Sequence, residues 1–455
     1  MTLPTLLVAN RGEIACRVLR AAKKLGLPNV AVYSEADKDA PHVKQADKAV
    51  FIGPPRAAES YLRGQALIDA AHQTGATLLH PGYGFLSENA EFASLCRSSG
   101  IQFVGPPSEV ITLMGDKEEA RRAAMRAGVP VLPGSSKLPV DDPQAIEAAG
   151  QATGFPLLVK ASAGGGGIGM RVVQSADQLL AAVEATSGMA LKAFGDGAVY
   201  LERMVQRARH VEIQVFGFGD GSAVHLFERD CSLQRRHQKV IEEAPAPVIP
   251  DALRSAMAAA AVQLAESCSY AGAGTVEFLY DAAAGEFFFL EMNTRIQVEH
   301  PVTEMISGVD LVACQLRLAM GADLSEELSQ ARIKASGHSV EARVYAENPA
   351  KNFIPSPGPL TTLQLPEMEN VRYETGYEQG SRVTPFYDPM ILKVVAHGPN
   401  RDAAIDLLDK ALSEMRIEGI ATNVAYLRAI LASPGFRAAE VHTNYLAQAH
   451  AQLLE

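Results

Sequence analysis

Apolar positions recur with two different periods along the first hundred residues. Ile14, Val18 and Ala22 have the spacing of one helical face, and this helical pattern follows a short apolar strand. Strands that alternate with helices predict a parallel sheet covered by helices. The expected strands cover residues 5–9, 29–33 and 77–80, and the expected helices begin at residue 13 and cover 65–73 and 90–98.

The rest of the chain predicts further regions with different patterns. Two strands flank a run of glycines, and a hairpin of apolar strands follows near residue 284. After Gly321 come a β-rich segment, a turn-rich segment and a helical tail. The expected strands cover 155–160, 170–173, 275–280, 287–290 and 338–345, the turns cover 355–359, and the tail is helical from residue 401.

Segment 291–299 has a polar face when it is read as a strand. Its alternate side chains are all polar on one side and mostly apolar on the other. The polar side comprises Glu291, Asn293, Arg295, Gln297 and Glu299. A half-exposed strand with solvated charges would show the same alternation, so a second observation is needed to favour a functional site.

The hairpin supplies that observation, because it brings another carboxylate to the polar face. Gly285 suits a loop position that needs a positive φ, and a hairpin centred on Ala284 places Glu277 opposite Glu291. Paired carboxylates with one amide oxygen are ligands that Mg²⁺ accepts. We therefore favour a site for a metal ion and an anion over a solvated strand.

A glycine run follows a strand that ends in Lys160. Consecutive glycines let backbone N–H groups approach phosphate oxygens closely. The run 164–167 is not a P-loop, because no Lys-Ser/Thr pair follows it. A flexible linker is the alternative, but the flanking strands favour a mobile lid over a nucleotide. Lys117 is a second candidate phosphate contact.

Segment 229–239 gathers basic side chains in an acidic protein. It holds Arg229, Arg235, Arg236, His237 and Lys239. A charged surface strand is the alternative, but the segment predicts a local trap for an anion. The formal net charge of −11 argues against nucleic acid as a partner, so an anionic substrate needs such a local patch.

The bulk properties favour a cytoplasmic enzyme of several folding units. A length of 455 residues suggests two to four units. The five cysteines show no paired spacing, so neither a zinc site nor a disulfide framework is expected. The N-terminus lacks a basic segment followed by an apolar run, and no stretch reaches the roughly 18 apolar residues of a membrane helix.

Six segments, taken in order, resemble biotin carboxylase, an ATP-grasp enzyme. They are Ala-Asn-Arg-Gly-Glu-Ile (9–14), His-Pro-Gly-Tyr-Gly-Phe-Leu-Ser-Glu (80–88), Met-Gly-Asp-Lys (114–117), Arg-His-Val-Glu-Ile-Gln (209–214), 229–239 with 242–247, and 291–301. The resemblance covers essentially the whole chain. It implies an α/β and α+β fold. The expected domains are a Rossmann-like N-terminal domain (1–114), an ATP-grasp domain (115–330) with a mobile lid at about 134–204, and a β-rich C-terminal domain (331–455).

The resemblance also implies a reaction, in which MgATP (or MnATP) activates bicarbonate to carboxyphosphate and N1′ of biotin is then carboxylated. The ATP-binding residues would be Lys117, Lys160, Gly164, Gly165, Gly166, Gly167, Met170, Glu202, Arg203, Met204, Val205, His210, Gln234 and His237. Of these, Lys117, Lys160, Gly166 and Gly167 would contact phosphates. Glu277, Glu291 and Asn293 would bind the metal. Lys239, Arg295, Gln297 and Val298 would position bicarbonate, Glu299 would be the general base, and Arg343 would stabilise the biotin enolate oxygen.

The implied partners are a separate biotin carboxyl carrier protein and a carboxyltransferase subunit. Biotin in carrier domains typically sits within Met-Lys-Met, and no methionine here is followed by lysine. A homodimer is expected, although Lys24 replaces an acid found in several bacterial relatives. Ile168 in the lid resembles the urea-carboxylase branch, whereas His237 fits the acyl-CoA type. The acceptor therefore stays open among acetyl-CoA (as in fatty acid biosynthesis), another acyl-CoA, pyruvate and urea.

Two other functions are weighed against this one. An ATP-grasp ligase joining a carboxylate to an amine would keep Lys160 and the metal residues but would not need Arg343. A nucleotide-binding regulatory subunit without turnover would be expected to lose Glu299 or Arg295, and both are present. The biotin carboxylase interpretation accounts for all of these residues.

Overall fold

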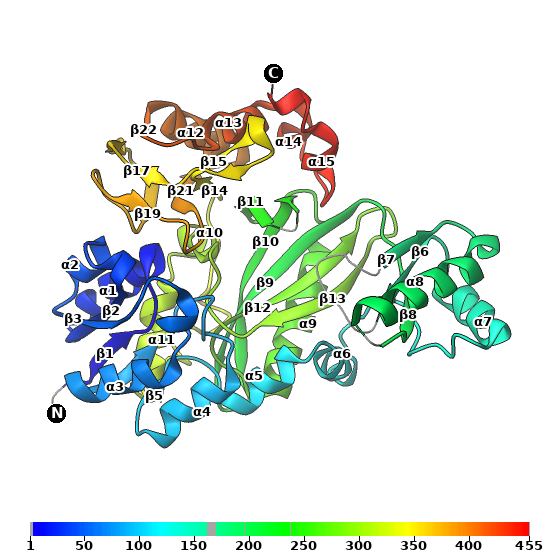
Figure 1. Cartoon of the computed structure of the whole chain (residues 1–455), viewed down its shortest axis with the longest axis horizontal. Helices are drawn as coiled ribbons and strands as arrows, with labels where there is room; N and C mark the ends of the chain where they lie inside the picture. Colours follow the sequence, from blue (N-terminus) through cyan, green and yellow to red (C-terminus); the bar gives the residue numbers. More distant parts are fainter. Residues whose placement is uncertain (1–2, 162–169, 195, 237, 455) are drawn as a thin grey trace. The chain divides into compact units, whose positions relative to one another are not determined.

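The structure, a computed structural model, describes residues 3–161, 170–194, 196–236 and 238–454. The chain divides into two compact units. Unit 1 comprises residues 1–129, 209–279 and 291–455, and unit 2 comprises 130–208 and 280–290. Figure 1 shows the elements of both units in sequence colours. The range predicted for the lid, about 134–204, falls within unit 2. The glycine run 164–167 lies outside the described residues.

The N-terminal part of unit 1 contains the predicted parallel sheet. Its strands are β1 (Thr5–Val8), β2 (Asn29–Ser34), β3 (Lys48–Gly53), β4 (Ala76–His80) and β5 (Gln102–Phe103). Their order is β3-β2-β1-β4-β5, and every neighbouring pair is parallel. The sequence did not indicate β3. This edge strand is largely exposed over its first four residues and lacks a regular alternation of apolar positions.

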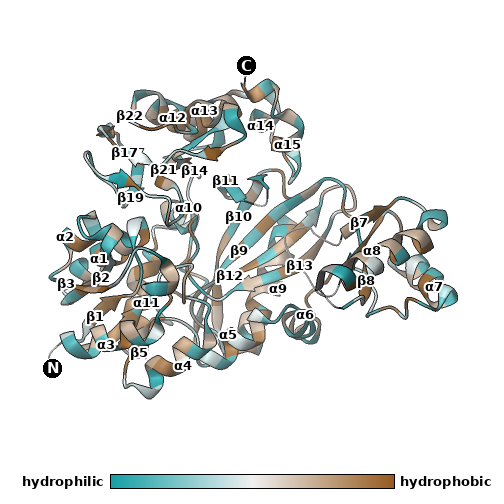
Figure 2. Ribbon diagram, in the orientation of Figure 1, coloured by the Kyte–Doolittle hydropathy of each residue, from teal (hydrophilic) through white to brown (hydrophobic). Residues whose placement is uncertain are grey.

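Helices accompany this sheet, and the helical patterns that begin at residue 13 and cover 65–73 and 90–98 predicted three of them. They are α1 (Gly12–Lys24), α2 (Pro41–Gln45), α3 (Gly64–Thr74), α4 (Ala90–Ser98), α5 (Ser108–Gly115) and α6 (Lys117–Arg126). Helix α1 buries Ile14, Val18 and Ala22, the face that the sequence predicted. Figure 2 shows hydrophilic and hydrophobic positions mixed along α3 and α4, as expected for helices with one buried face.

Strands from residues 208–398 form one eight-stranded sheet. Its strands are β9 (Ala208–Phe218), β10 (Ala223–Arg235), β11 (Gln238–Ala244), β12 (Ala271–Asp281), β13 (Glu286–Asn293), β14 (His338–Tyr345), β19 (Val371–Thr375) and β21 (Met390–Gly398). Their order is β13-β12-β9-β10-β11-β14-β21-β19. The β12–β13 hairpin turns at Gly285, which has a φ of 67° and donates its N–H to the Asp281 carbonyl at 2.9 Å. The predicted hairpin and its positive φ are therefore confirmed.

The prediction that residues 291–299 form one strand is wrong. Strand β13 ends at Asn293, and residues 294–299 form a loop that leads into α10 (His300–Ser307). The loop is held by side-chain hydrogen bonds to segments far away in sequence, and these override the local alternation. The side chains of Gln297 and Glu299 are nevertheless both buried, as are those of Thr294 and Ile296.

The remaining elements of unit 1 include α9 (Asp251–Ser267), α11 (Leu311–Ala319), α12 (Arg401–Glu414), α13 (Val424–Ala432), α14 (Pro434–Arg437) and α15 (Tyr445–Ala449). Short strands β15 (Glu347–Asn348), β16 (Ile354–Pro355), β17 (Gly358–Pro359), β18 (Thr362–Gln364), β20 (Arg382–Val383) and β22 (Arg416–Glu418) complete the C-terminal region. Helices α12 and α13 pack with β14 and β21 around one apolar cluster that includes Val344, Leu392 and Leu427. The helical tail and the β-rich segment before it are thus confirmed.

Unit 2 has its own small sheet and core. Strands β6 (Leu157–Ala161), β7 (Met170–Val173) and β8 (Val199–Arg203) are antiparallel in the order β7-β6-β8. Helices α7 (Pro143–Thr153) and α8 (Leu179–Phe194) pack on it around Leu157, Val159 and Val183. Among the described residues of both units, no helix combines the length and the apolar character needed to cross a bilayer.

Candidate active site

Neighbouring strands of the long sheet carry a cluster of charged side chains. Strand β9 contributes Glu212, β11 contributes Lys239, β12 contributes Glu277 and β14 contributes Arg343. The loop after β13 adds Glu299. The three acids and the arginine are buried, and the Lys239 side chain is only 13% exposed. The cluster therefore contains more acidic than basic groups in a place with little water.

Lys239 is at the centre of this cluster. Its Nζ lies 2.6 Å from Oε2 of Glu212, 2.5 Å from Oε1 of Glu299 and 3.1 Å from Oε1 of Glu277. Burial alone would lower the pKa of Lys239, but the neighbouring acidic groups outweigh it and the pKa is raised well above its usual value. The ammonium group therefore stays charged at neutral pH.

Glu299 lies between two cations. One carboxylate oxygen accepts from Lys239, and the other accepts from Nη2 of Arg343 at 3.0 Å. Burial by itself raises the pKa of Glu299, but Lys239, Arg343 and Arg229 lower it well below its usual value. Arg343 also forms an ion pair with Glu242, whose pKa burial raises to about 7. Glu299 is consequently ionised at neutral pH.

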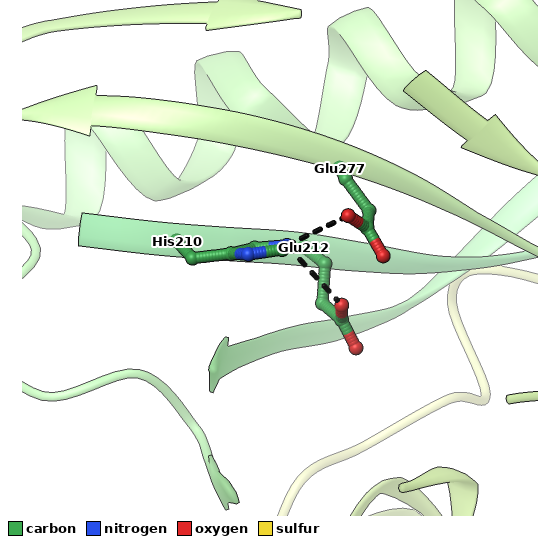
Figure 3. Close-up of side chains that lie close together, drawn as sticks. All are labelled: His210, Glu212 and Glu277. Carbon is green, nitrogen blue, oxygen red and sulfur yellow. Dashed lines mark ion pairs between the residues drawn. The ribbon is translucent and has the colours of Figure 1, made fainter. Parts of the chain in front are cut away.

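Figure 3 shows His210 and Glu212 on one strand facing Glu277 on the next. Nε2 of His210 lies 2.8 Å from Oε2 of Glu277 and 3.8 Å from Oε2 of Glu212. The pKa of His210 is raised, because Glu277 and Glu212 outweigh the effect of burial. The pKa of Glu277 is lowered, since Lys239 and His210 outweigh burial there. His210 and Glu212 project to the same side because they are two residues apart on β9.

Two of the three predicted metal ligands, Asn293 and Glu277, are in contact, and Glu291 is repelled electrostatically by Glu277. Asn293 donates from Nδ2 to Oε1 of Glu277 at 2.9 Å, while its amide oxygen accepts from Arg295 at 2.8 Å. The pKa of Glu291 is raised by loss of hydration and by repulsion from Glu277, and Lys117 partly offsets this. Two carboxylates that repel each other fit a site for a divalent cation, because the cation would relieve the repulsion.

Arg295 is held by a residue from another predicted motif. Its Nε donates to Oε2 of Glu88 at 2.8 Å, and the other oxygen of Glu88 accepts from the Thr294 backbone N–H at 3.2 Å. Glu88 ends the His80–Glu88 motif, which follows β4. The motif therefore fixes the start of the loop that carries the predicted catalytic residues.

The next residues of the loop are fixed from two other sides. The Gln297 side chain contacts Arg229 at 2.6 Å and Glu277 at 2.8 Å. The Val298 carbonyl accepts from Nζ of Lys393 at 2.6 Å. Lys393 is fully buried and also pairs with Glu13 at 3.0 Å. The Ala9–Ile14 motif and β21 thus both hold the loop in place.

The prediction of a joint anion trap over 229–239 is wrong for most of its members. Arg229 is fully buried, Arg235 pairs with Glu347 at 2.7 Å, and Arg236 donates to Asn352 at 2.9 Å. Lys239 and the buried Arg229 both contact acids of the cluster, and His237 lies outside the described residues. Charge counted along the sequence does not distinguish a buried arginine from a free one, which explains the error.

The other predicted nucleotide-binding residues are distributed over both units. In unit 1, Lys117 opens α6, His210 lies in β9, and Gln234 in β10 is paired with Lys239 on β11. In unit 2, Lys160 forms an ion pair with Glu202, and Arg203 donates to Glu286 at 2.7 Å. Met170 begins β7, whereas Met204 and Val205 directly follow β8. Gly164–Gly167 lie outside the described residues.

Sequence reasoning missed four residues that contribute to this cluster: Glu88, Glu212, Glu242 and Lys393. Glu212 could have been found, because its two-residue spacing from His210 on a strand is the signal that was used for 291–299. Glu242 lies in the 242–247 segment that carries the resemblance but was given no role, and Lys393 carries no local signal; the partners of both are distant in sequence. Cys231 is buried 4.0 Å from Glu299, and burial raises the pKa of its thiol well above the usual value.

Three family models match the chain in succession. "Biotin carboxylase, N-terminal domain" matches residues 2–111, "Carbamoyl-phosphate synthase L chain, ATP binding domain" matches 116–327, and "Biotin carboxylase C-terminal domain" matches 341–448.

Known proteins are similar over the same length. Biotin carboxylase 2 of Bacillus subtilis is 50% identical over 443 residues, which cover 97% of this chain and 99% of that protein. The mitochondrial methylcrotonoyl-CoA carboxylase subunit alpha of Oryza sativa is 48% identical over 99% of this chain, which spans 61% of that subunit. A crystal structure of the biotin carboxylase domain dimer of Hydrogenobacter thermophilus 2-oxoglutarate carboxylase, in complex with MgADP, ADP and bicarbonate, is also similar. It has a TM-score of 0.89 and 42% identity, and the match covers 100% of this chain and 99% of that one.

Proposed function

The chain belongs to the biotin carboxylase family, and we propose that it carboxylates biotin carried by a separate protein, with ATP and bicarbonate as the other substrates. It is a ligase, as its relatives are. The observation that supports the proposal most strongly is the position of Glu299 between Lys239 and Arg343, because a base and two anion-binding cations meet there. The division into domains at 1–114, 115–330 and 331–455 stays part of this proposal.

Bicarbonate is proposed to bind beside Glu299, positioned by Lys239, Arg295, Gln297 and Val298. Bicarbonate is a weak nucleophile, and a carboxylate that removes its proton would strengthen it. Its oxygen then attacks the γ-phosphorus of ATP, ADP leaves, and carboxyphosphate forms. Phosphoryl transfer of this kind depends on positioning and charge neutralisation more than on covalent help from the protein.

The low pKa of Glu299 gives these cations a second role. Lys239 and Arg343 suppress the basicity of the free carboxylate. A bound bicarbonate would compete for Lys239, and a developing biotin enolate would compete for Arg343. Glu299 would therefore become a stronger base when the substrates are present, which would limit unproductive proton removal in the free enzyme.

Glu277, Glu291 and Asn293 are proposed to hold Mg²⁺ or Mn²⁺, which when bound would neutralise phosphate charge. We propose that ATP is bound in unit 1 by Lys117, His210 and Gln234. In unit 2, the residues proposed to bind ATP are Lys160, Met170, Glu202, Arg203, Met204 and Val205, together with Gly164–Gly167. His237 is proposed for the same ligand. Lys117 and Lys160 suit phosphates because an ammonium group is a compact positive charge.

The acceptor that finally receives the carboxyl group is proposed to be an acyl-CoA. The methylcrotonoyl-CoA carboxylase subunit, whose name specifies an acyl-CoA, supports this choice. The partners would then be a biotin carboxyl carrier protein and a carboxyltransferase. An avidin blot tests the separate carrier: the expected result is no biotinylated band at the mass of this chain, 48.5 kDa. A homodimer is proposed as well, and sedimentation of the purified protein measures it.

ATP hydrolysis tests the proposed function. The purified protein should hydrolyse ATP slowly, and free biotin together with bicarbonate should increase the rate. The reason is that Lys239 is proposed to bind bicarbonate and Arg343 is proposed to stabilise the biotin enolate, and both lie at Glu299. An ATPase rate that responds to neither biotin nor bicarbonate would exclude the proposal.

A further inference from the structure

Arg229 is the largest of the fully buried side chains, and it lies beneath the acidic cluster. Its guanidinium group donates to five side chains from three other elements and one loop. The acceptors are Glu212 at 2.6 Å, Gln214 at 2.6 Å, Thr303 at 3.0 Å, Thr275 at 3.1 Å and Gln297 at 2.6 Å. One charged group thus connects β9, β10, β12 and α10 with the loop 294–299.

The contact with Gln297 determines which way its amide faces. A guanidinium group only donates hydrogen bonds, so the amide oxygen must face Arg229. The amide nitrogen then faces the opposite way and donates to Oε1 of Glu277 at 2.8 Å. An ionised carboxylate only accepts, so both neighbours require the same orientation. The amide nitrogen carries two hydrogens, and Glu277 is its one acceptor among the described residues, so one N–H is available to an anion.

Arg229 also orients the carboxylate that holds Lys239. Oε1 of Glu212 accepts from Arg229, while Oε2 accepts from Lys239 at 2.6 Å. The Gln297 amide and the Glu212 carboxylate are therefore both oriented by the guanidinium group of Arg229. Loss of Arg229 would remove one of the two contacts that orient the Gln297 amide and would leave Glu212 buried with one partner fewer.

We infer that Arg229 is a positioning residue for the bicarbonate site, because it turns the Gln297 amide so that an N–H group faces the bound anion. The inference deepens the proposed function and rests on it. A fully buried arginine is costly, and an apolar replacement of similar volume is often neutral or stabilising in other proteins. Its contacts with Gln297 and Glu212 give a functional reason for its presence here.

Arg229→Lys tests the inference directly. Lysine keeps the charge but cannot reach Glu212, Gln214 and Gln297 at once, because it has one nitrogen instead of three. The KM for bicarbonate should rise by about tenfold or more, the effect of one lost hydrogen bond to a charged group. The KM for ATP should stay within about twofold. Thr303→Val is the matched control, since it removes another contact of Arg229 and leaves Gln297 in place; its KM for bicarbonate should not change.

The double variant Arg229→Lys with Gln297→Ala distinguishes positioning from a general structural effect. If Arg229 acts mainly through Gln297, Arg229→Lys should raise the KM for bicarbonate much less in the Gln297→Ala background than in the parent. If the two effects add, or if the KM values for ATP and bicarbonate rise together, the inference is wrong.

Gln297→Glu covers the case in which Arg229→Lys does not fold. A carboxylate at this position still accepts from Arg229 but has no N–H to offer an anion, so the KM for bicarbonate should again rise about tenfold or more. An unchanged KM would overturn the inference. Measurements on the parent enzyme distinguish failure of the proposed function from failure of the inference. The proposed function fails if the parent shows no ATP turnover that depends on biotin and bicarbonate. Only the inference fails if the parent shows this turnover and the variants keep a normal KM for bicarbonate.

Discussion

Glu277 and Glu299 at the proposed centre are charged because cations from other segments stabilise them. Glu299 follows β13, whereas its partners Lys239 and Arg343 belong to β11 and β14. The residue types could be predicted from the sequence, but the pKa values could not. Strand alternation assigns a side chain to a face, and only the folded sheet determines which cation lies beside it.

Glu299→Gln tests the proposed base. The amide is similar in size, but it can accept from only one of Lys239 and Arg343, and it cannot take a proton. Biotin-dependent ATP turnover should fall by about a hundredfold or more, while the KM for ATP stays nearly unchanged. Glu242→Gln is the matched control, because it alters a buried acid that also pairs with Arg343, and its effect should be much smaller. Normal turnover in Glu299→Gln would show that the base is another group.

His80 provides a prediction about pH. Burial lowers its pKa to about 4 from the model-peptide value of 6.5, and Nδ1 accepts from the Gly82 N–H at 2.9 Å, which requires the neutral ring. The unfolded chain therefore binds a proton first as the pH falls. The stability from this group is present above about pH 6.5 and is lost as the pH falls towards 4.

Urea unfolding of the parent and of His80→Asn, each at pH 7 and pH 5, measures this effect. From pH 7 to pH 5, the free energy of unfolding of the parent should fall by about 2 kcal/mol more than that of the variant. If both proteins show the same change in free energy of unfolding, His80 does not carry the expected pH dependence.

The elements show where local patterns succeed and where they fail. The hairpin β12–β13, the parallel sheet and helix α1 were predicted because local alternation and burial agree in them. The loop 294–299 was predicted as a strand because its polar residues alternate, but long-range hydrogen bonds with Glu88, Arg229 and Lys393 determine its path. These partners lie in other segments, so a pattern confined to nine residues could not reveal them.

Gly285→Ala tests the hairpin. The glycine has a positive φ of 67°, and an added Cβ would meet no atom within 4 Å, so the cost is purely conformational. The free energy of unfolding should fall by about 1 kcal/mol. Gly188→Ala in α8 is the control: its Cβ also meets no atom within 4 Å, but its backbone is helical, so stability should rise by up to about 1 kcal/mol. A stabilising Gly285→Ala would contradict the turn geometry.

At the scale of the whole molecule, the residues proposed for carboxylation all belong to unit 1. Lys239, Arg295, Gln297, Glu299 and Arg343 come from segments that the sequence separates and the long sheet brings together. The small sheet of unit 2 carries its own ion pair between Lys160 and Glu202. The order of motifs along the chain predicted the family, whereas the contacts among these motifs required the fold.

Transfer of label from [¹⁴C]bicarbonate to free biotin tests the central claim most directly. ATP hydrolysis alone is shared with other ATP-grasp ligases, but carboxylation of biotin is not. The account predicts acid-labile radioactivity on biotin that requires both ATP and Mg²⁺ and that is reduced about a hundredfold or more in Glu299→Gln. Hydrolysis of ATP without any label on biotin, under the same conditions, would contradict the account.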